Sequence, residues 1–186
     1  MYHNVKPNYK HRYKTDYLNK HIPHRLNLLI TYRERFSNLS DSQIENIRDL
    51  YRCAKDISIM MVRLLLDEMG IKLPRNANEL NDLKEHESDV IKMGIVMAIN
   101  KEDILNHNDK HEIFKVLVAA NRAVAHTNEG FINHNVDKMA LLKAIDFIEY
   151  NIEKNIYHHN SESLREIMSL PDNNMQRSSL NLNKVL

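Results

Sequence analysis

The stretch Asp109–Thr127, DKHEIFKVLVAANRAVAHT, constrains the fold of this chain more than any other. Its side chains are apolar over most of the circumference of a helix, and a helix of this kind is normally buried among other helices. Asp109 and Glu112 have the spacing of a capping box, and Gly130 is a natural helix terminator. The sequence therefore predicts a core helix here. Its apolar residues are Ile113, Phe114, Val116, Leu117, Val118, Ala119, Ala120, Ala123, Val124 and Ala125.

Composition favours helices in the rest of the chain as well. The 186 residues include three glycines and four prolines, whereas an all-β fold needs many turns. Leu, Ile, Met, Lys, Glu and Ala are frequent, and these residues favour helices. The length fits one domain. The formal net charge of +1 does not indicate a strongly basic nucleic-acid binder.

Apolar residues at helical spacing predict further helices on both sides of the core helix. These helices cover residues 24–36, 40–69, 78–100 and 136–157, with a short final helix over 162–170. Ser40 and Gln43 form a second capping-box signature, and Gly70 marks the end of the helix that follows. Because the connections are short, neighbouring helices should run antiparallel. The predicted fold is all-α: an antiparallel up-and-down bundle of four to five helices over residues 22–170, with the core helix at its centre.

Both ends of the chain differ in composition from the predicted bundle. Residues 1–21 form a basic N-terminal arm rich in tyrosine, in which positive charge could bind phosphates and tyrosine rings could stack on bases. The alternative is an arm that lies on the surface of the domain. Residues 171–186 are predicted to be a disordered tail.

Cysteine content and hydropathy indicate where the protein works. Cys53 is the only cysteine, so an intramolecular disulfide cannot form and a reducing compartment fits. The N-terminus is polar and basic and lacks the apolar core of a signal peptide. The apolar runs are too short to span a bilayer. These features predict a cytoplasmic protein that does not enter a membrane.

A stripe of cationic or titratable side chains runs along the core helix. His111, Lys115, Arg122 and His126 fall in one narrow arc at about 100° per residue. Arginine can hold a phosphate through two parallel hydrogen bonds, and histidine can transfer protons near neutral pH. Arg122 and His126, one turn apart, therefore suit phosphodiester cleavage, with the arginine stabilising charge and the histidine acting as acid or base. The alternative is the solvated side of an amphipathic helix.

The segment ANRAVAH, residues 120–126, lies on an apolar helix and is followed by a loop and a last amphipathic helix. In this context it resembles the Arg/His motif of HEPN domains, and the resemblance covers residues 26–157. In that family a polar residue such as asparagine usually follows the arginine, and four to six residues separate it from the histidine. Here three residues separate Arg122 from His126, and Asn121 precedes the arginine.

The resemblance implies a protein that acts on or binds RNA. HEPN domains include metal-independent ribonucleases of toxin–antitoxin, phage-defence and CRISPR systems, whose active members bring two Arg/His motifs together in a homodimer. It implies Arg122 and His126 as catalytic residues, and Asn121, Lys115 and His111 as candidates for substrate contacts. Other members only bind or scaffold, so the alternative is a non-catalytic helical module that dimerises or binds a protein partner such as an antitoxin.

One further pair of side chains suggests a metal site. His107 and His111 have the spacing of two metal ligands on a helix, but a catalytic zinc needs a third protein ligand, and none is spaced nearby. The sequence also lacks a glycine-rich phosphate loop and a dinucleotide-binding fingerprint. We therefore expect neither a metal nor a cofactor.

Overall fold

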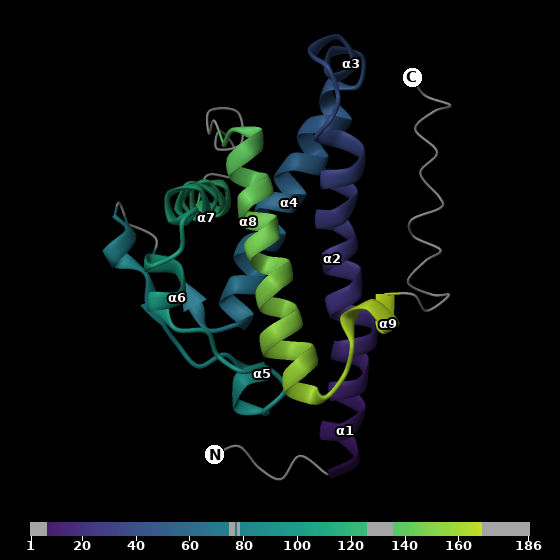
Figure 1. Cartoon of the computed structure of the whole chain (residues 1–186), viewed down its shortest axis with the longest axis vertical. Helices are drawn as coiled ribbons and strands as arrows, with labels where there is room; N and C mark the ends of the chain where they lie inside the picture. The colour runs from purple at the N-terminus through teal and green to yellow at the C-terminus, as the bar shows by residue number, and fades with distance from the viewer. Residues whose placement is uncertain (1–6, 75–76, 78, 126–135, 169–186) are drawn as a thin grey trace.

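The computed structural model describes residues 7–74, 77, 79–125 and 136–168, with only the backbone described for residues 7–10 and 123–125. These residues are mostly helical (Figure 1), which confirms the predicted all-α class. None of the described helices is both long and apolar enough to cross a membrane. The predicted tail, residues 171–186, lies outside the described residues, as does Gly130.

The N-terminal segment is helical where a separate arm was predicted. Helix α1 (Pro7–Asp16), the π-turn η1 (Tyr17–His21), α2 (Ile22–Thr31) and the π-turn η2 (Tyr32–Phe36) follow one another without a break. Leu18 is buried in the core in phase with Ile22 and Leu26, so the predicted boundary at residue 21 does not separate two units. Pro23 lacks an N–H group and would distort a regular helix. The π-turn accommodates it, with the Ile22 N–H donating to the Tyr17 carbonyl.

The predicted helix over residues 40–69 is present as two pieces, α3 (Asp41–Asn46) and α4 (Arg48–Glu68). The Ser40–Gln43 capping box is confirmed: the Gln43 N–H donates to Ser40 Oγ at 3.4 Å, and the Ser40 N–H donates to Gln43 Oε1 at 3.0 Å. Gly70 ends the helix as predicted, with a φ of +91° that only glycine adopts readily. Strand β1 (Ile71–Lys72) follows and pairs antiparallel with β2 (Lys84–Glu85).

The helix predicted over residues 78–100 is wrong. This region contains the 3₁₀ turn η3 (Leu80–Asp82), β2 and the short helix α5 (Asp89–Lys92), and the rest is irregular. Its backbone bonds to other elements: the Met97 N–H donates to the Asn155 carbonyl at 2.9 Å, and the Ile99 N–H donates to the Met69 carbonyl at 3.0 Å. The apolar residues of the segment are still buried. Their spacing is like that of a helix, but the segment that carries them is mostly irregular. They include Leu83, Val90, Ile95, Val96 and Ile99.

The remaining elements form the second half of the chain. Helix α6 (Lys101–Leu105) leads into α7 (Lys110–Ala125), which corresponds to the predicted core helix. Helix α8 (Lys138–Ile152) continues into the π-turn η4 (Glu153–Tyr157), in agreement with the helix predicted over residues 136–157. A 3₁₀ turn, η5 (His158–Asn160), and the short helix α9 (Leu164–Met168) complete the described chain.

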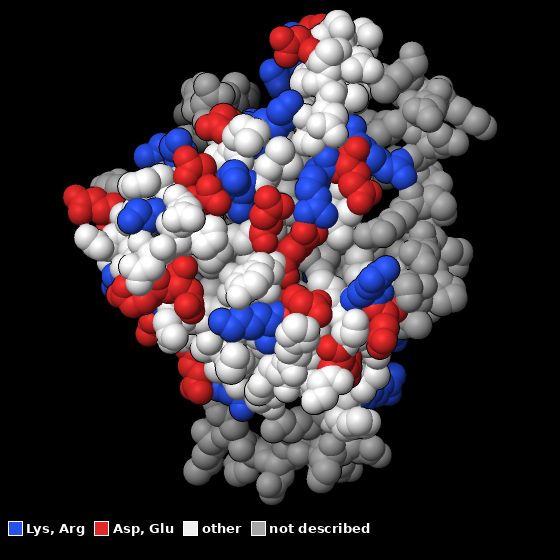
Figure 2. Space-filling view, in the orientation of Figure 1, with Lys and Arg blue, Asp and Glu red and all other residues white. Residues whose placement is uncertain are grey.

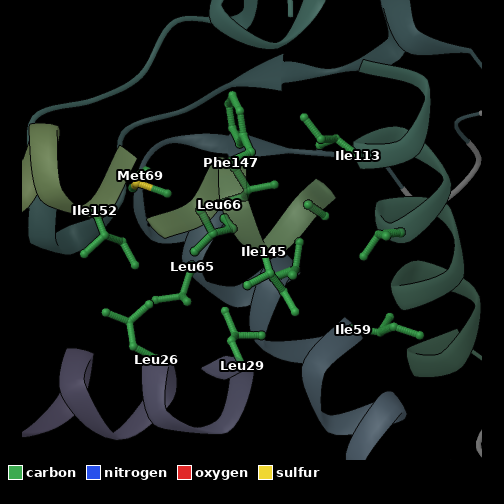
Figure 3. Close-up of a cluster of buried hydrophobic side chains, with 14 of the residues drawn as sticks. Leu26, Leu29, Ile59, Leu65, Leu66, Met69, Ile113, Ile145, Phe147 and Ile152 are labelled. Atoms are coloured by element: carbon green, nitrogen blue, oxygen red, sulfur yellow. The ribbon is translucent and has the colours of Figure 1, made fainter. Parts of the chain in front are cut away.

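Helix α4 occupies the central position that the sequence assigned to α7. It packs against α2, α7 and α8, whereas α7 packs mainly against α8 and α4. Side chains from these four helices meet in the core, among them Leu29, Leu66, Ile113 and Ile145 (Figure 3). In Figure 1, α2 and α8 stand upright while α7 is seen nearly end-on. The up-and-down arrangement predicted for the whole bundle therefore does not extend to α7.

A polar cluster, which we call the Glu68 cluster, fixes α4 against the N-terminal helices. The Tyr17 hydroxyl donates to Glu68 Oε2 at 2.9 Å, and Arg25 Nη1 donates to both oxygens of the same carboxylate. Burial and the neighbouring Glu68 carboxylate raise the pKa of Tyr17, so its hydroxyl keeps the proton that it donates. The cluster joins Glu68 to two residues that precede it by 51 and 43 positions in the sequence.

Candidate functional site

The two sides of α7 have different environments. Ile113, Val116 and Leu117 are buried against the neighbouring helices. His111 and Lys115, in contrast, are exposed. The described part of the predicted stripe therefore lies on the solvent side of a helix whose other side belongs to the core.

Arg122 lies in the last turn of α7 and is exposed. None of the described residues forms a hydrogen bond or an ion pair with its guanidinium. An arginine in this state can offer its full set of donors to an external anion, and a phosphate is the anion that best fits its planar geometry. The position of Arg122 is therefore compatible with the predicted contact to a phosphate.

Asn121, the neighbour of Arg122, points into the protein. It is 8% exposed, and its Nδ2 donates to the carbonyls of Leu73 and Pro74 at 2.9 and 3.1 Å. These bonds attach the end of α7 to the chain that leaves β1. Because successive residues on a helix are rotated by about 100°, fixing Asn121 inward also fixes Arg122 outward. Asn121 therefore positions Arg122, and its predicted contact with a substrate stays a prediction.

The predicted catalytic partner of Arg122 has no described position. His126 belongs to residues 126–135, which lie outside the described residues. Chain connectivity alone links it to Arg122, since α7 reaches Ala125. The structure therefore positions one member of the proposed catalytic pair.

The side chain of His107, which the sequence suggested as a metal ligand, makes contacts within the protein. Its Nδ1 accepts a hydrogen bond from the Asp109 N–H at 3.1 Å, and its ring lies edge-on to Phe147 with 5.0 Å between the ring centres. The Nδ1 lone pair is thereby occupied at the start of α7. Among the described residues, no group of three or more His, Cys, Asp or Glu side chains is placed to hold a metal ion.

Lys55 of α4 is a cation that sequence analysis did not single out. Its side chain is half-buried, and burial lowers its pKa, whereas the nearby Asp56 and Asp137 act in the opposite direction. Asp137 caps α8, with the Ala140 N–H donating to Asp137 Oδ1 at 2.7 Å. Lys55 therefore lies near the point where the chain enters α8. The signal in the sequence was a lysine in phase with the buried residues Ile59 and Val62.

Replacing Lys55 by methionine should leave the melting temperature at neutral pH unchanged or raise it. A lysine with a lowered pKa in the folded state binds its proton more weakly there than in the unfolded chain. The wild type should therefore gain stability as the pH rises towards the ordinary lysine pKa of 10.5. The Lys55→Met variant should lack this gain, which thermal melts across the same pH range would measure.

The matched control is Lys115→Met, which removes an exposed lysine on α7. This variant should keep the wild-type dependence of stability on pH. A Lys55→Met protein that melts well below the wild type at neutral pH would contradict the prediction, because the charged lysine would then be stabilising the fold.

Charge on the visible surface is mixed. In the view of Figure 2, basic and acidic side chains of the described residues alternate and form no continuous basic area. This agrees with the formal net charge of +1. On this face, a contact with a nucleic acid would therefore depend on a small number of positioned cations and not on a broad positive surface.

Comparison with known proteins gives no relative for this chain: no protein-family model matches it, and neither a curated protein nor a solved structure shows significant similarity. The resemblance of residues 120–126 to the HEPN motif therefore stays a prediction from the sequence.

Proposed function

We propose that this chain is a HEPN-like helical protein that acts on RNA as a metal-independent endoribonuclease of a toxin–antitoxin or phage-defence system. The observation that supports the proposal most is the exposed Arg122, which has no hydrogen-bond or ion-pair partner among the described residues. Asn121 holds the turn from which it projects. An arginine open to solvent on a helical turn that a buried neighbour anchors is a suitable phosphate ligand.

In this proposal each residue of the stripe has a chemical role. Arg122 binds the scissile phosphate and stabilises the charge that develops on it, and His126 transfers a proton as acid or base. Lys115 precedes Arg122 by two turns, about 10 Å at 1.5 Å per residue, and could contact a second phosphate of the same strand. His111, one turn further along the exposed side, extends this row.

The proposed active form is a cytoplasmic homodimer, because one Arg/His pair supplies few catalytic groups and HEPN ribonucleases combine two pairs. A non-catalytic interaction module, which binds a second copy or a protein partner such as an antitoxin, is the alternative function. The exposed apolar residues of α4, among them Leu50 and Ile57, favour this alternative because they are suited to contact another helix.

Binding of RNA should depend on Arg122. The Arg122→Ala variant should bind a fluorescently labelled single-stranded RNA about tenfold more weakly than the wild type, because it loses a charge-assisted contact to phosphate. Fluorescence anisotropy at fixed salt would measure the change.

Cleavage of mixed RNA by the wild type should continue in EDTA, since the proposed mechanism uses no metal.

Arg165→Ala is the matched control, because it removes an exposed arginine from α9, away from α7. It should bind RNA like the wild type. Equal weakening by both variants would indicate non-specific attraction between charges. Cleavage that EDTA abolishes and a divalent ion restores would refute the metal-independent mechanism.

A further inference from the structure

Helix α4 has a second apolar side that faces away from the core. Leu50, Ile57 and Leu64 recur every seven residues and are 42%, 44% and 36% exposed. Cys53 and Met60 follow the first two of them by three residues; Cys53 is exposed, whereas Met60 is partly buried and also packs against the edge of the core. This is the spacing of the contact positions in a two-stranded coiled coil. We call these five residues the α4 seam.

The position of α4 makes an uncovered seam unusual. Its inner side, which includes Ile59, Val62 and Leu66, is buried against α2, α7 and α8. The most central helix of the described structure therefore has apolar residues on two opposite sides, and only one of them is covered. Single exposed apolar side chains are common in soluble proteins, but a regular heptad row on one helix is typical of a helix–helix interface.

Two opposite charges border the seam on one side. Asp56 and Arg63 immediately precede Ile57 and Leu64, the position that carries interhelical ion pairs in coiled coils. Within one helix they are about 10 Å apart along the axis, too far to pair with each other. Neither is within ion-pair distance of another described residue, although Arg52 and Lys55 of the same helix interact electrostatically with Asp56.

We infer that the α4 seam binds the α4 seam of a second copy of this chain, with the two helices antiparallel across a two-fold axis. In the matching register, Ile57 packs against Met60 of the second copy, and Cys53 packs against Leu64 of the second copy. Asp56 then lies beside Arg63 of the second copy, and the symmetry forms this pair twice. A shift by one heptad would place either Asp56 or Arg63 opposite its own equivalent.

This charge pattern is the reason to choose a second copy as the occupant. Asp56 is followed seven positions later by Arg63. When a second copy of the helix runs antiparallel to the first, each negative residue faces a positive one. The inference goes beyond the proposed function and does not depend on RNA binding: α7 packs on the side of α4 opposite the seam, so this interface would not by itself bring two Arg122 residues together. Association can therefore be tested separately from activity.

The first experiment measures the oligomeric state of the full chain by sedimentation over a range of concentrations. The wild type should form a dimer, and Ile57→Asp should raise its dissociation constant at least about 100-fold, because two charges would enter the centre of the apolar contact. The matched control is Met139→Asp, which changes a residue of α8 that is 57% exposed and outside the seam. This control should dimerise like the wild type.

Charge exchange tests the register. Asp56→Arg and Arg63→Asp should each weaken the dimer roughly tenfold, because each replaces two attractive contacts by two repulsive ones. The double variant Asp56→Arg/Arg63→Asp should restore the dimer, since both pairs form again with the charges reversed. A contact of Asp56 within its own chain would not be restored in this way, so recovery is specific for the pairing between copies.

A disulfide gives an independent measurement. The Leu64→Cys variant should form two disulfides under mild oxidation, each between the introduced cysteine of one copy and the natural Cys53 of the other. The Cys53→Ser/Leu64→Cys variant should not form this dimer.

A wild type that stays monomeric would overturn the inference, and so would a dimer that Ile57→Asp leaves intact. A monomer that Ile57→Asp destabilises would show that the chain covers its own seam. A seam-dependent dimer without RNA binding would support this inference and refute the proposed function.

Discussion

Replacing His126 by alanine should lower the rate of RNA cleavage by about 10²–10⁴-fold while the melting temperature stays near that of the wild type. This is the usual contribution of a positioned general acid or base. His126 follows the exposed Arg122 by four residues in the sequence, and the opposite side of α7 supplies the core contacts. Single-turnover cleavage of a defined RNA, with the protein in excess, would measure the chemical step separately from product release.

Two further variants test whether the loss of cleavage is specific to the proposed catalytic pair. Arg122→Lys should also lower the rate, because lysine keeps the charge but loses the two-pronged contact with phosphate. His159→Ala removes an exposed histidine from η5 and should have no effect. A folded and fully active His126→Ala protein would refute the catalytic assignment. A His126→Ala protein that unfolds would instead indicate that the histidine is part of the core.

Replacing Glu68 by alanine should lower the free energy of unfolding by about 3 kcal/mol, because Arg25 would keep a poorly solvated charge without its partner. The side chains of Arg25 and Glu68 are 21% and 16% exposed, so solvent replaces the lost interaction only in part. Tyr17, which is buried, would lose the acceptor of its hydroxyl at the same time. Urea denaturation followed by circular dichroism would measure the loss.

A double-mutant cycle separates the Arg25–Glu68 interaction from other effects. Arg25→Ala/Glu68→Ala should be less destabilised than the sum of the two single variants, because the double variant leaves no unpaired charge. Glu87→Ala, which removes an exposed carboxylate near α5, should change stability by less than about 0.5 kcal/mol. If Glu68→Ala is as mild as Glu87→Ala, the Glu68 cluster does not hold α4 to the N-terminal helices.

Local interactions explain why part of the fold could be predicted from the sequence. The Ser40–Gln43 capping box and the stop at Gly70 depend on residues next to each other in the chain. The polarity of α7 likewise follows from the spacing of its own residues, so the exposure of Lys115 and Arg122 was predictable. These features need no information about what packs against the helix.

Distant contacts explain the parts that the sequence did not predict. Residues 80–99 have apolar spacing like that of a helix, but β1 and the backbone near Asn155 supply hydrogen-bond partners that compete with helix formation. The continuation of α2 into η1 and α1 is stabilised by Tyr157, whose hydroxyl donates to the Leu18 carbonyl at 2.8 Å. None of these contacts can be predicted from the local sequence of the segment that it stabilises.

The same division applies to the candidate site and to the α4 seam. The sequence by itself determined that α7 is a helix with a cationic stripe, because helical periodicity is a local property. Only the tertiary structure decided that Asn121 turns inward to the Leu73 and Pro74 carbonyls and that α4 is the central helix. Which apolar side of α4 becomes buried depends on the other helices that pack there, since both sides have helical spacing and only contacts distant in sequence distinguish them.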